Sequence, residues 1–165
     1  SQTGTFQSGG IEVSGGGDLA TIAGDSSAIT LSPSGDYEFV NANFGSGYRM
    51  YGVDGVNRGF EFDGTVFCPI DTGMGNQSGF SDKPNHVTEH KDHLFYSFNH
   101  SVQHSAIGDP YNFEPVLGAA EIATSDLVSN FAIQPGSEGN ATLLILNDNV
   151  AYMLYGNSSL DWNLV

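Results

Sequence analysis

Positively charged side chains are scarce in this chain. Its 165 residues include four cations and 19 acidic side chains, which gives a formal net charge of −15. The four cations are Arg49, Arg58, Lys83 and Lys91. So few cations cannot build the phosphate-neutralising patch that nucleic-acid binding requires, and the same charge disfavours an anionic membrane surface. We therefore expect neither nucleic acid nor a membrane among the partners.

Cysteine and long apolar runs are also nearly absent. Cys68 is the single cysteine, so an intramolecular disulfide is excluded, and its apolar neighbours predict a small buried side chain. No run approaches the roughly 18 apolar residues of a membrane-spanning helix. The chain is nevertheless long enough to form one well-buried domain.

Catalytic signatures are missing as well. The sequence contains no G-x-S-x-G nucleophile elbow and no Gly-rich phosphate loop between a strand and a helix. Its glutamates show no spacing that selects two of them as an acid–base pair; the candidates are Glu61, Glu89, Glu114 and Glu121. We therefore predict a non-enzymatic protein that uses no cofactor.

Glycine, in contrast, is abundant, and its 22 residues together with many Ser, Asn and Asp favour turns over helices. Residues 1–36 carry the least side-chain mass. In this segment we expect short strands at Ile11–Val13, Leu19–Ile22 and Ala28–Leu31, which would form a Gly-rich β-hairpin module or appendage. A disordered terminus is the alternative.

From residue 37 onward a strand pattern repeats three times, over about 37–80, 84–126 and 128–165. Each copy begins with a strand and ends with an aromatic residue followed by a short apolar tail. These aromatics are Phe67, Phe113 and Trp162, and they recur about 46 and 49 residues apart, a spacing typical of propeller blades. We predict an all-β fold of antiparallel blade-like repeats, a partial or assembled β-propeller, in which the three aromatics pack between adjacent units.

Two segments within the repeats carry predictions of their own. Leu143–Leu146 is a continuous apolar run, which is typical of a strand buried on both faces. Residues 118–126 could hold a helical turn.

Three units do not close a ring of the usual four to eight blades. We therefore expect either that the chain is a segment of a longer polypeptide or that another chain covers its open edges.

All the histidines fall within the second repeat: His86, His90, His93, His100 and His104. Neutral imidazole is a common ligand of zinc and copper. Across a hairpin, His93 and His100 could approach each other, and Asp92 could supply a carboxylate. Polar surface positions and turn hydrogen bonds are the alternative for these residues.

Asp-Gly pairs at 54–55 and 63–64 raise the question of calcium. An EF-hand loop needs acidic oxygens at alternate positions and a closing glutamate, and neither stretch provides them. Hairpin turns, in which the Asp-Gly pair supplies a positive φ, explain both stretches without a bound ion.

Four segments of the second half form a recognisable pattern: PNHVTEHKDHLFYSF at 84–98, SAIGDPYNF at 105–113, GAAEIAT at 118–124 and YGNSSLDWNL at 155–164. Together they resemble bacteriophage virion proteins with propeller-like repeats, which are found among tail and head–tail connector components of tailed phages. The resemblance implies a structural subunit of a virion, located there or extracellularly. Such a subunit would assemble into an oligomer with other virion proteins or with copies of itself. The resemblance carries over no catalytic residue.

Two other functions stay open from the residues. An extracellular carbohydrate-binding or adhesive β-domain would use exposed aromatic rings, such as Tyr111 or Tyr152, to stack on sugars. A fragment of a propeller glycosidase would instead require two carboxylates about 5–9.5 Å apart at a common cleft.

Overall fold

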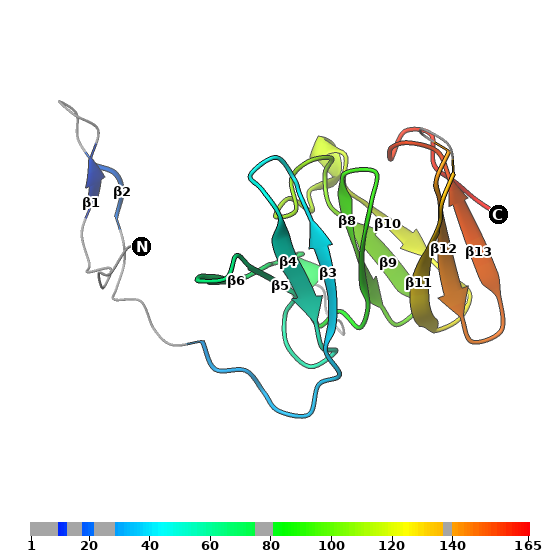
Figure 1. Ribbon diagram of the computed structural model, residues 1–165, viewed down its shortest axis with the longest axis horizontal. Helices are drawn as coiled ribbons and strands as arrows, with labels where there is room; N and C mark the ends of the chain where they lie inside the picture. The colour runs from blue at the N-terminus through cyan, green and yellow to red at the C-terminus, as the bar shows by residue number, and fades with distance from the viewer. Residues whose placement is uncertain (1–9, 13–17, 22–28, 75–80, 137–139) are drawn as a thin grey trace. The chain divides into compact units, whose positions relative to one another are not determined.

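β-Strands make up nearly all of the regular structure in the computed structural model, which describes residues 10–12, 18–21, 29–74, 81–136 and 140–165 (Figure 1). The chain divides into two units, residues 1–31 and residues 32–165. In the first unit, β1 (Gly10–Glu12) pairs antiparallel with β2 (Asp18–Thr21). The strand expected at 28–31 begins outside the described residues, and residues 29–31 form no strand.

The described part of residues 32–165 contains three four-stranded antiparallel sheets, in each of which every strand pairs with the next strand along the chain. The first sheet comprises β3 (Glu38–Ala42), β4 (Arg49–Val53), β5 (Phe60–Phe62) and β6 (Phe67–Pro69). The second comprises β7 (Val87–His90), β8 (His93–Phe98), β9 (Ser101–His104) and β10 (Ala120–Ala123). The third comprises β11 (Val128–Gln134), β12 (Thr142–Asn147), β13 (Ala151–Tyr155) and β14 (Asn163–Leu164).

The prediction of an all-β fold is confirmed. Within the described residues there is no α-helix, and the sheets do not close into a ring. A short 3₁₀ turn, Pro115–Leu117, precedes β10. The helical turn expected at 118–126 is wrong, because Ala120–Ala123 pairs with β9 and alternates half-buried and exposed side chains as an edge strand does. No helix in the described segments has the length and hydrophobicity that a bilayer crossing demands.

Positive-φ turn residues occur in several of the connections within the sheets. Lys91 and Asp92 form the two-residue connection between β7 and β8, and both have positive φ, 51° and 60°, as expected of a type I′ hairpin turn. Gly55 and Gly64 also have positive φ, 72° and 97°. The Asp-Gly pairs therefore serve as hairpin turns, because glycine reaches this backbone region without a steric penalty.

Two apolar cores separate the three sheets. The first core lies between the first and second sheets and contains Tyr51 and Val53 from one and Leu94 and Tyr96 from the other. The second core lies between the second and third sheets, and its largest buried members are Phe95, Phe131, Leu143, Ile145 and Leu154. Since the second sheet is covered on both faces, all six residues of β8 are buried.

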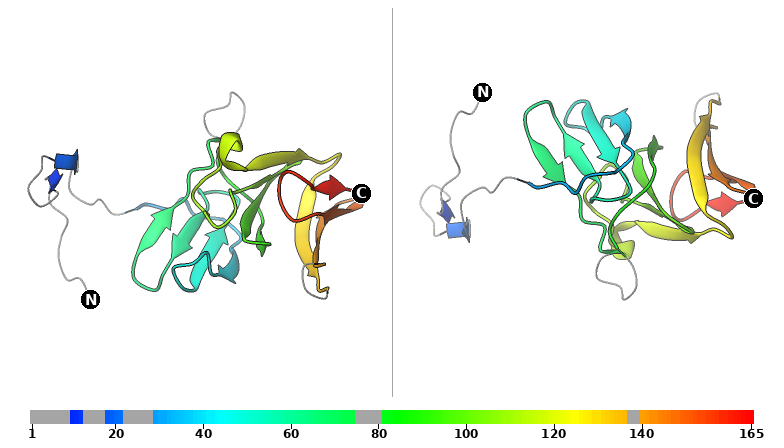
Figure 2. Two further views of the ribbon diagram at one scale, coloured as in Figure 1. Left: turned by 90° about the horizontal axis from the view of Figure 1, so that it is seen from above. Right: turned by 90° about the horizontal axis from the view of Figure 1, so that it is seen from below.

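The first strands of the sheets lie next to one another. β3 packs beside β7, and β7 packs beside β11, although each pair is separated by more than 35 residues of chain. Both views in Figure 2 show the three sheets of residues 32–165 in chain order, with the second sheet between the first and the third. The order leaves the first and third sheets at the two ends of the array, each with one face that no other sheet in the described part of residues 32–165 covers.

Candidate functional site

The residues predicted as weak metal ligands are not brought together. His93 begins β8, whereas His100 lies in the exposed turn after the same strand. A strand of this length separates its two ends by about 20 Å, since each residue advances about 3.3 Å. Asp92 lies in the turn beside His93, where its backbone N–H donates to Glu89 Oε1 at 3.0 Å. Among the described residues, no three His, Cys, Asp or Glu side chains are grouped so as to hold a metal ion.

His93 belongs instead to a buried histidine cluster. The β7–β8 hairpin pairs His93 directly with His90, and β8–β9 pairing places His104 opposite Phe95. Because directly paired residues share a face, all four side chains are turned toward the third sheet. Residue parity counted along one strand does not reveal this contact, because parity does not continue through a turn.

The electrostatics of the cluster follow from its burial. Burial lowers the pKa of both His90 and His104 to about 4, because the charged imidazolium is poorly solvated there. The Nδ1 atoms of His93 and His104 lie 2.6 Å and 2.8 Å from one acceptor, the carbonyl oxygen of Ser105. A carbonyl accepts only, so both Nδ1 atoms carry hydrogen. His90 and His104 are therefore neutral packing elements at neutral pH.

Each sheet has a leading face, turned toward the preceding sheet in chain order, and a trailing face, turned toward the following one. Phe113 lies against the core between the first two sheets and stacks on Tyr96, with ring centroids 5.8 Å apart. Trp162 lies against the core between the second and third sheets, 4.1 Å from the His104 ring centroid. Phe67 stacks on Phe60 at 4.4 Å on the leading face of the first sheet, which no other described sheet of residues 32–165 covers.

That leading face of the first sheet is largely apolar, with Asn41 as its exposed polar residue. Strand pairing aligns Phe39 with Gly52, Phe60 and Pro69, and aligns Asn41 with Met50, Phe62 and Phe67. Val40, Ala42, Tyr51 and Val53 alternate with these residues and point into the first core. The open face is thus defined by Phe39, Met50, Phe60, Phe62, Phe67 and Pro69.

Aromatic rings form much of the surface of this open face. Phe39 and the preceding Tyr37 stack at 5.8 Å and are 50% and 49% exposed. Phe60 lies beneath them and is only 5% exposed. Gly52 makes the arrangement possible, because a Cβ atom at this position would lie 2.5 Å from Phe60 and 2.8 Å from Phe39. Both rings therefore pack closely against β4 at Gly52.

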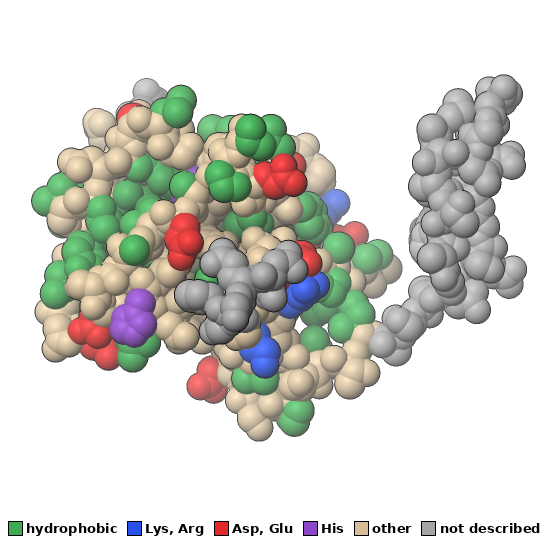
Figure 3. Space-filling view, turned by 180° about the vertical axis from the view of Figure 1, so that it is seen from behind, with side chains coloured by type: hydrophobic (Ala, Val, Ile, Leu, Met, Phe, Trp, Pro, Cys, Tyr) green, Lys and Arg blue, Asp and Glu red, His purple; other side chains and the backbone are tan. Residues whose placement is uncertain are grey.

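The trailing face of the third sheet is the second open face. Pairing aligns Ala132 with Leu144 and Met153, and aligns Leu146 with Ala151. Leu144, Leu146 and Met153 are half-buried, although their neighbours Leu143, Ile145 and Leu154 are fully buried in the second core. Figure 3 shows hydrophobic side chains gathered on the side of residues 32–165 that carries the third sheet.

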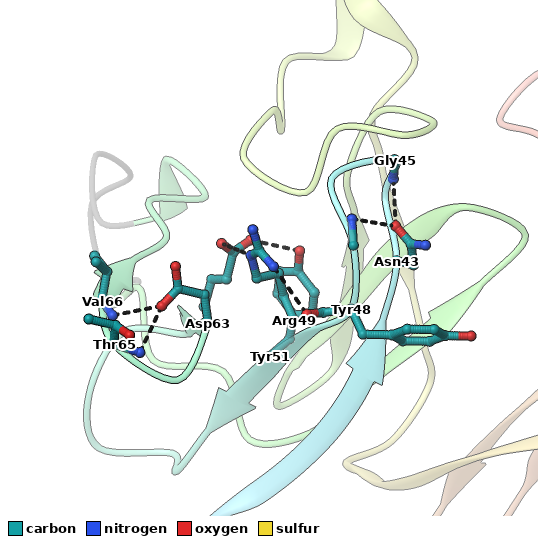
Figure 4. Close-up of polar contacts among 10 residues, drawn as sticks. Asn43, Gly45, Tyr48, Arg49, Tyr51, Asp63, Thr65 and Val66 are labelled. Carbon is teal, nitrogen blue, oxygen red and sulfur yellow. Dashed lines mark hydrogen bonds and ion pairs between the residues drawn. The ribbon is translucent and has the colours of Figure 1, made fainter. Parts of the chain in front are cut away.

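Charged side chains of the first sheet lie on its covered, trailing face. Figure 4 shows Tyr51 donating to Glu61 Oε2 at 2.7 Å, with Arg49 Nε 3.6 Å from Glu61 Oε1. Burial and the neighbouring Glu61 carboxylate raise the pKa of Tyr51 above its usual range. These contacts link β4 to β5, so the ionised groups contribute to the fold of the sheet.

The Asp-Gly turns use their carboxylates in the same structural way. Asp54 accepts from the backbone N–H groups of Val56 and Asn57 at 2.9 and 2.6 Å, and from Asn57 Nδ2 at 2.6 Å. Asp63 accepts from the N–H groups of Thr65 and Val66 at 2.8 and 2.7 Å (Figure 4). Both are the hydrogen bonds of Asx turns, which agrees with the hairpin interpretation of these two stretches.

An open cleft of about 590 Å³ lies beside the 3₁₀ turn. Tyr111 lines it with a ring that is 44% exposed, and Phe113 forms part of its wall. Carboxylates also line the cleft; these are Asp71, Asp109 and Glu114. Tyr152, the other aromatic considered for sugar stacking, packs against the second core and hydrogen-bonds to Ser125.

Comparison with known proteins identifies no relative of this chain. The chain matches no protein-family model, no curated protein and no solved structure. Its function must therefore be inferred from its own residues and contacts.

Proposed function

We propose that the protein is a structural, non-enzymatic virion subunit, a tail or head–tail connector component of a tailed phage, that acts by protein–protein assembly. One observation carries this proposal: the two end sheets of the array each present an open, uncharged face on which apolar side chains are interspersed with a few polar ones such as Asn41 and Asn130. The strand positions of these faces hold no charged residue, in a chain with 23 charged side chains. Depletion of charge within an apolar patch is a property of protein interfaces.

The blade-like organisation supports the same proposal. Each sheet is a meander of four antiparallel strands, and the first strands of successive sheets are neighbours. Propeller blades share both properties, since each blade places its first strand near the central axis. In this interpretation the three sheets are propeller-like blades. The open faces of the first and third sheets bind other subunits.

Purified particles of the phage that encodes the chain provide the test. We expect quantitative mass spectrometry to find the protein at a fixed copy number per particle, and immunogold labelling to place it at the tail or the connector. A chain that is produced during infection but is absent from purified particles would contradict the proposal.

A carbohydrate-binding function is the second candidate, because Tyr111 presents an exposed ring beside carboxylates in the cleft described above. Sugars stack on aromatic rings while their hydroxyl groups donate to carboxylates. Binding on a glycan array that is lost in Tyr111→Ala and retained in Tyr48→Ala would support this function. Tyr48 is a suitable control because it is 77% exposed outside the cleft. The absence of any glycan signal from the wild type would exclude it.

A further inference from the structure

We infer that a second copy of this chain covers both open faces, with the leading face of the first sheet in one copy packed on the trailing face of the third sheet in the other. The inference rests on the proposed function, because it names the partner of the assembly surfaces. Two copies joined in this way at both ends would form a closed ring of six sheets.

The chain itself contains two examples of the required interface. In the first core, the trailing face of the first sheet packs on the leading face of the second through Tyr51 and Tyr96. In the second core, the trailing face of the second sheet packs on the leading face of the third through Phe95 and Phe131. The two faces left open are one leading face and one trailing face. They are therefore the two halves of one more interface of the same type.

The recurrent aromatic position supports this assignment on the leading side. Phe113 and Trp162 each lie at a core between two sheets, next to the last strand of their own sheet. Phe67 begins the last strand of the first sheet and lies on its leading face, stacked on Phe60. Phe67 is therefore equivalent in position to two aromatics that lie between sheets, but within residues 32–165 it has a described sheet on one side only. A second copy of the chain would supply the sheet on its other side.

β12 supports the assignment on the trailing side. Leu143 and Ile145 are fully buried in the second core, whereas Leu144 and Leu146 on the opposite face are only half-buried. A continuous apolar run is typical of strands covered on both faces, as β8 is in the middle sheet. Packing of a second copy would bring β12 into the same environment as β8.

Symmetry explains why a copy of the same chain fits. An interface between two different faces is heterologous, and it closes into a ring when the rotation between copies permits. Sheets of this kind form rings of about four to eight blades, and two copies of a three-sheet array reach six. Both open faces would then be buried, with no apolar surface remaining at either end.

A complementation experiment with two full-length variants tests the inference. Phe39→Asp places a charge on the leading face of the first sheet, and Leu144→Asp places one on the trailing face of the third. In sedimentation-velocity experiments over a range of concentrations, we expect the wild type to be a dimer and each variant alone to be a monomer. An equimolar mixture should form a heterodimer, because each variant retains the face that the other has lost.

The controls separate this result from misfolding. Val116→Asp, at an 84% exposed position on the 3₁₀ turn, should remain a dimer, and circular dichroism should show that all variants fold. If Phe39→Asp dissociates the dimer and Leu144→Asp does not, the first-sheet faces pair with each other and the head-to-tail inference is wrong. A monomeric wild type, or long polydisperse oligomers, would also overturn the closed pair. The proposed function would survive each of these results if the protein is present in purified particles.

Discussion

The imidazole rings of His93 and His104 lie nearly perpendicular, at 86°, with their centroids 4.9 Å apart. They come from neighbouring strands of the second sheet and share the carbonyl of Ser105 as hydrogen-bond acceptor. Trp162 of the third sheet lies against both rings. The contact between these two sheets therefore includes two buried imidazole rings.

Protonation of the buried histidines should weaken the fold. The pKa of His90 and His104 is about 4 in the folded chain and about 6.5 in the unfolded chain, so the unfolded state binds more protons between these values. The stabilisation is complete above about pH 6.5 and is lost as the pH falls toward about 4. We expect each histidine to lower the free energy of unfolding by about 1–2 kcal/mol between pH 7 and about pH 5.

Urea unfolding at a series of pH values measures this effect. Replacement His90→Gln should reduce the slope of stability against pH, because one buried titrating group is removed. His100→Gln is the matched control, since His100 is exposed in the turn after β8 and should leave the slope unchanged. An identical slope in the wild type and in His90→Gln would show that burial of this imidazole does not control acid sensitivity.

Trp162 should contribute strongly to the packing of the second core. Its ring contacts His93, Phe95 and His104, with centroids within 4.1–5.1 Å. We expect Trp162→Ala to lower the free energy of unfolding by about 2–3 kcal/mol, because it removes apolar contacts and leaves a cavity. Chemical unfolding followed by circular dichroism measures the loss. Leu160→Ala, at a 96% exposed position, should change stability by less than about 0.5 kcal/mol.

Gly52 and Gly59 should differ in what their replacement disturbs. A Cβ at Gly52 would collide with Phe60 and Phe39 on the open leading face, whereas a Cβ at Gly59 would lie 2.6 Å from the Tyr96 hydroxyl in the first core. Each Gly→Ala change should lower stability by about 1–3 kcal/mol through overpacking. Gly52→Ala alone should also weaken self-association by sedimentation. Equal weakening by both variants would argue against the open face as the contact surface.

The Asp54 carboxylate should stabilise the turn between β4 and β5. Burial opposes its ionisation, but hydrogen bonds from Asn57 and Val56 outweigh burial and lower its pKa. The ionised form is therefore favoured by folding, and its stabilisation is present above the unfolded pKa and lost as pH falls through the folded value. We expect Asp54→Ala to lower the thermal midpoint at neutral pH, with a loss of about 1–3 kcal/mol. Asp36→Ala, at an exposed position, should have little effect.

Much of the fold could be predicted because strands leave a local signal. The apolar run at 143–146 falls within a strand of the structure, β12. The Asp-Gly pairs mark real turns because their chemistry is contained within four residues. The segment 118–126 was misjudged, since pairing with β9 decides its conformation and no local pattern reports that partner.

The candidate site was less accessible to prediction than the fold. The sequence indicates that His93 and His100 could approach across a hairpin, whereas the β7–β8 hairpin pairs His93 with His90, and β9 brings His104 to it. The open faces were also hidden, because a strand period of two shows that Phe39 and Phe60 lie on the opposite side of the sheet from Tyr51 but does not show which side is covered. That choice depends on which sheet packs against which.

The sequence by itself determined the all-β architecture, the positions of the turns and the recurrence of Phe67, Phe113 and Trp162, because each follows from side-chain periodicity and backbone preference over a few residues. Only the tertiary structure decided that Phe113 and Trp162 lie at cores between sheets while Phe67 lies on an uncovered face. Burial is a property of contacts between segments far apart in the chain. For that reason, residues with the same local pattern lie at a core in the second and third sheets but are half-buried on an open face in the first.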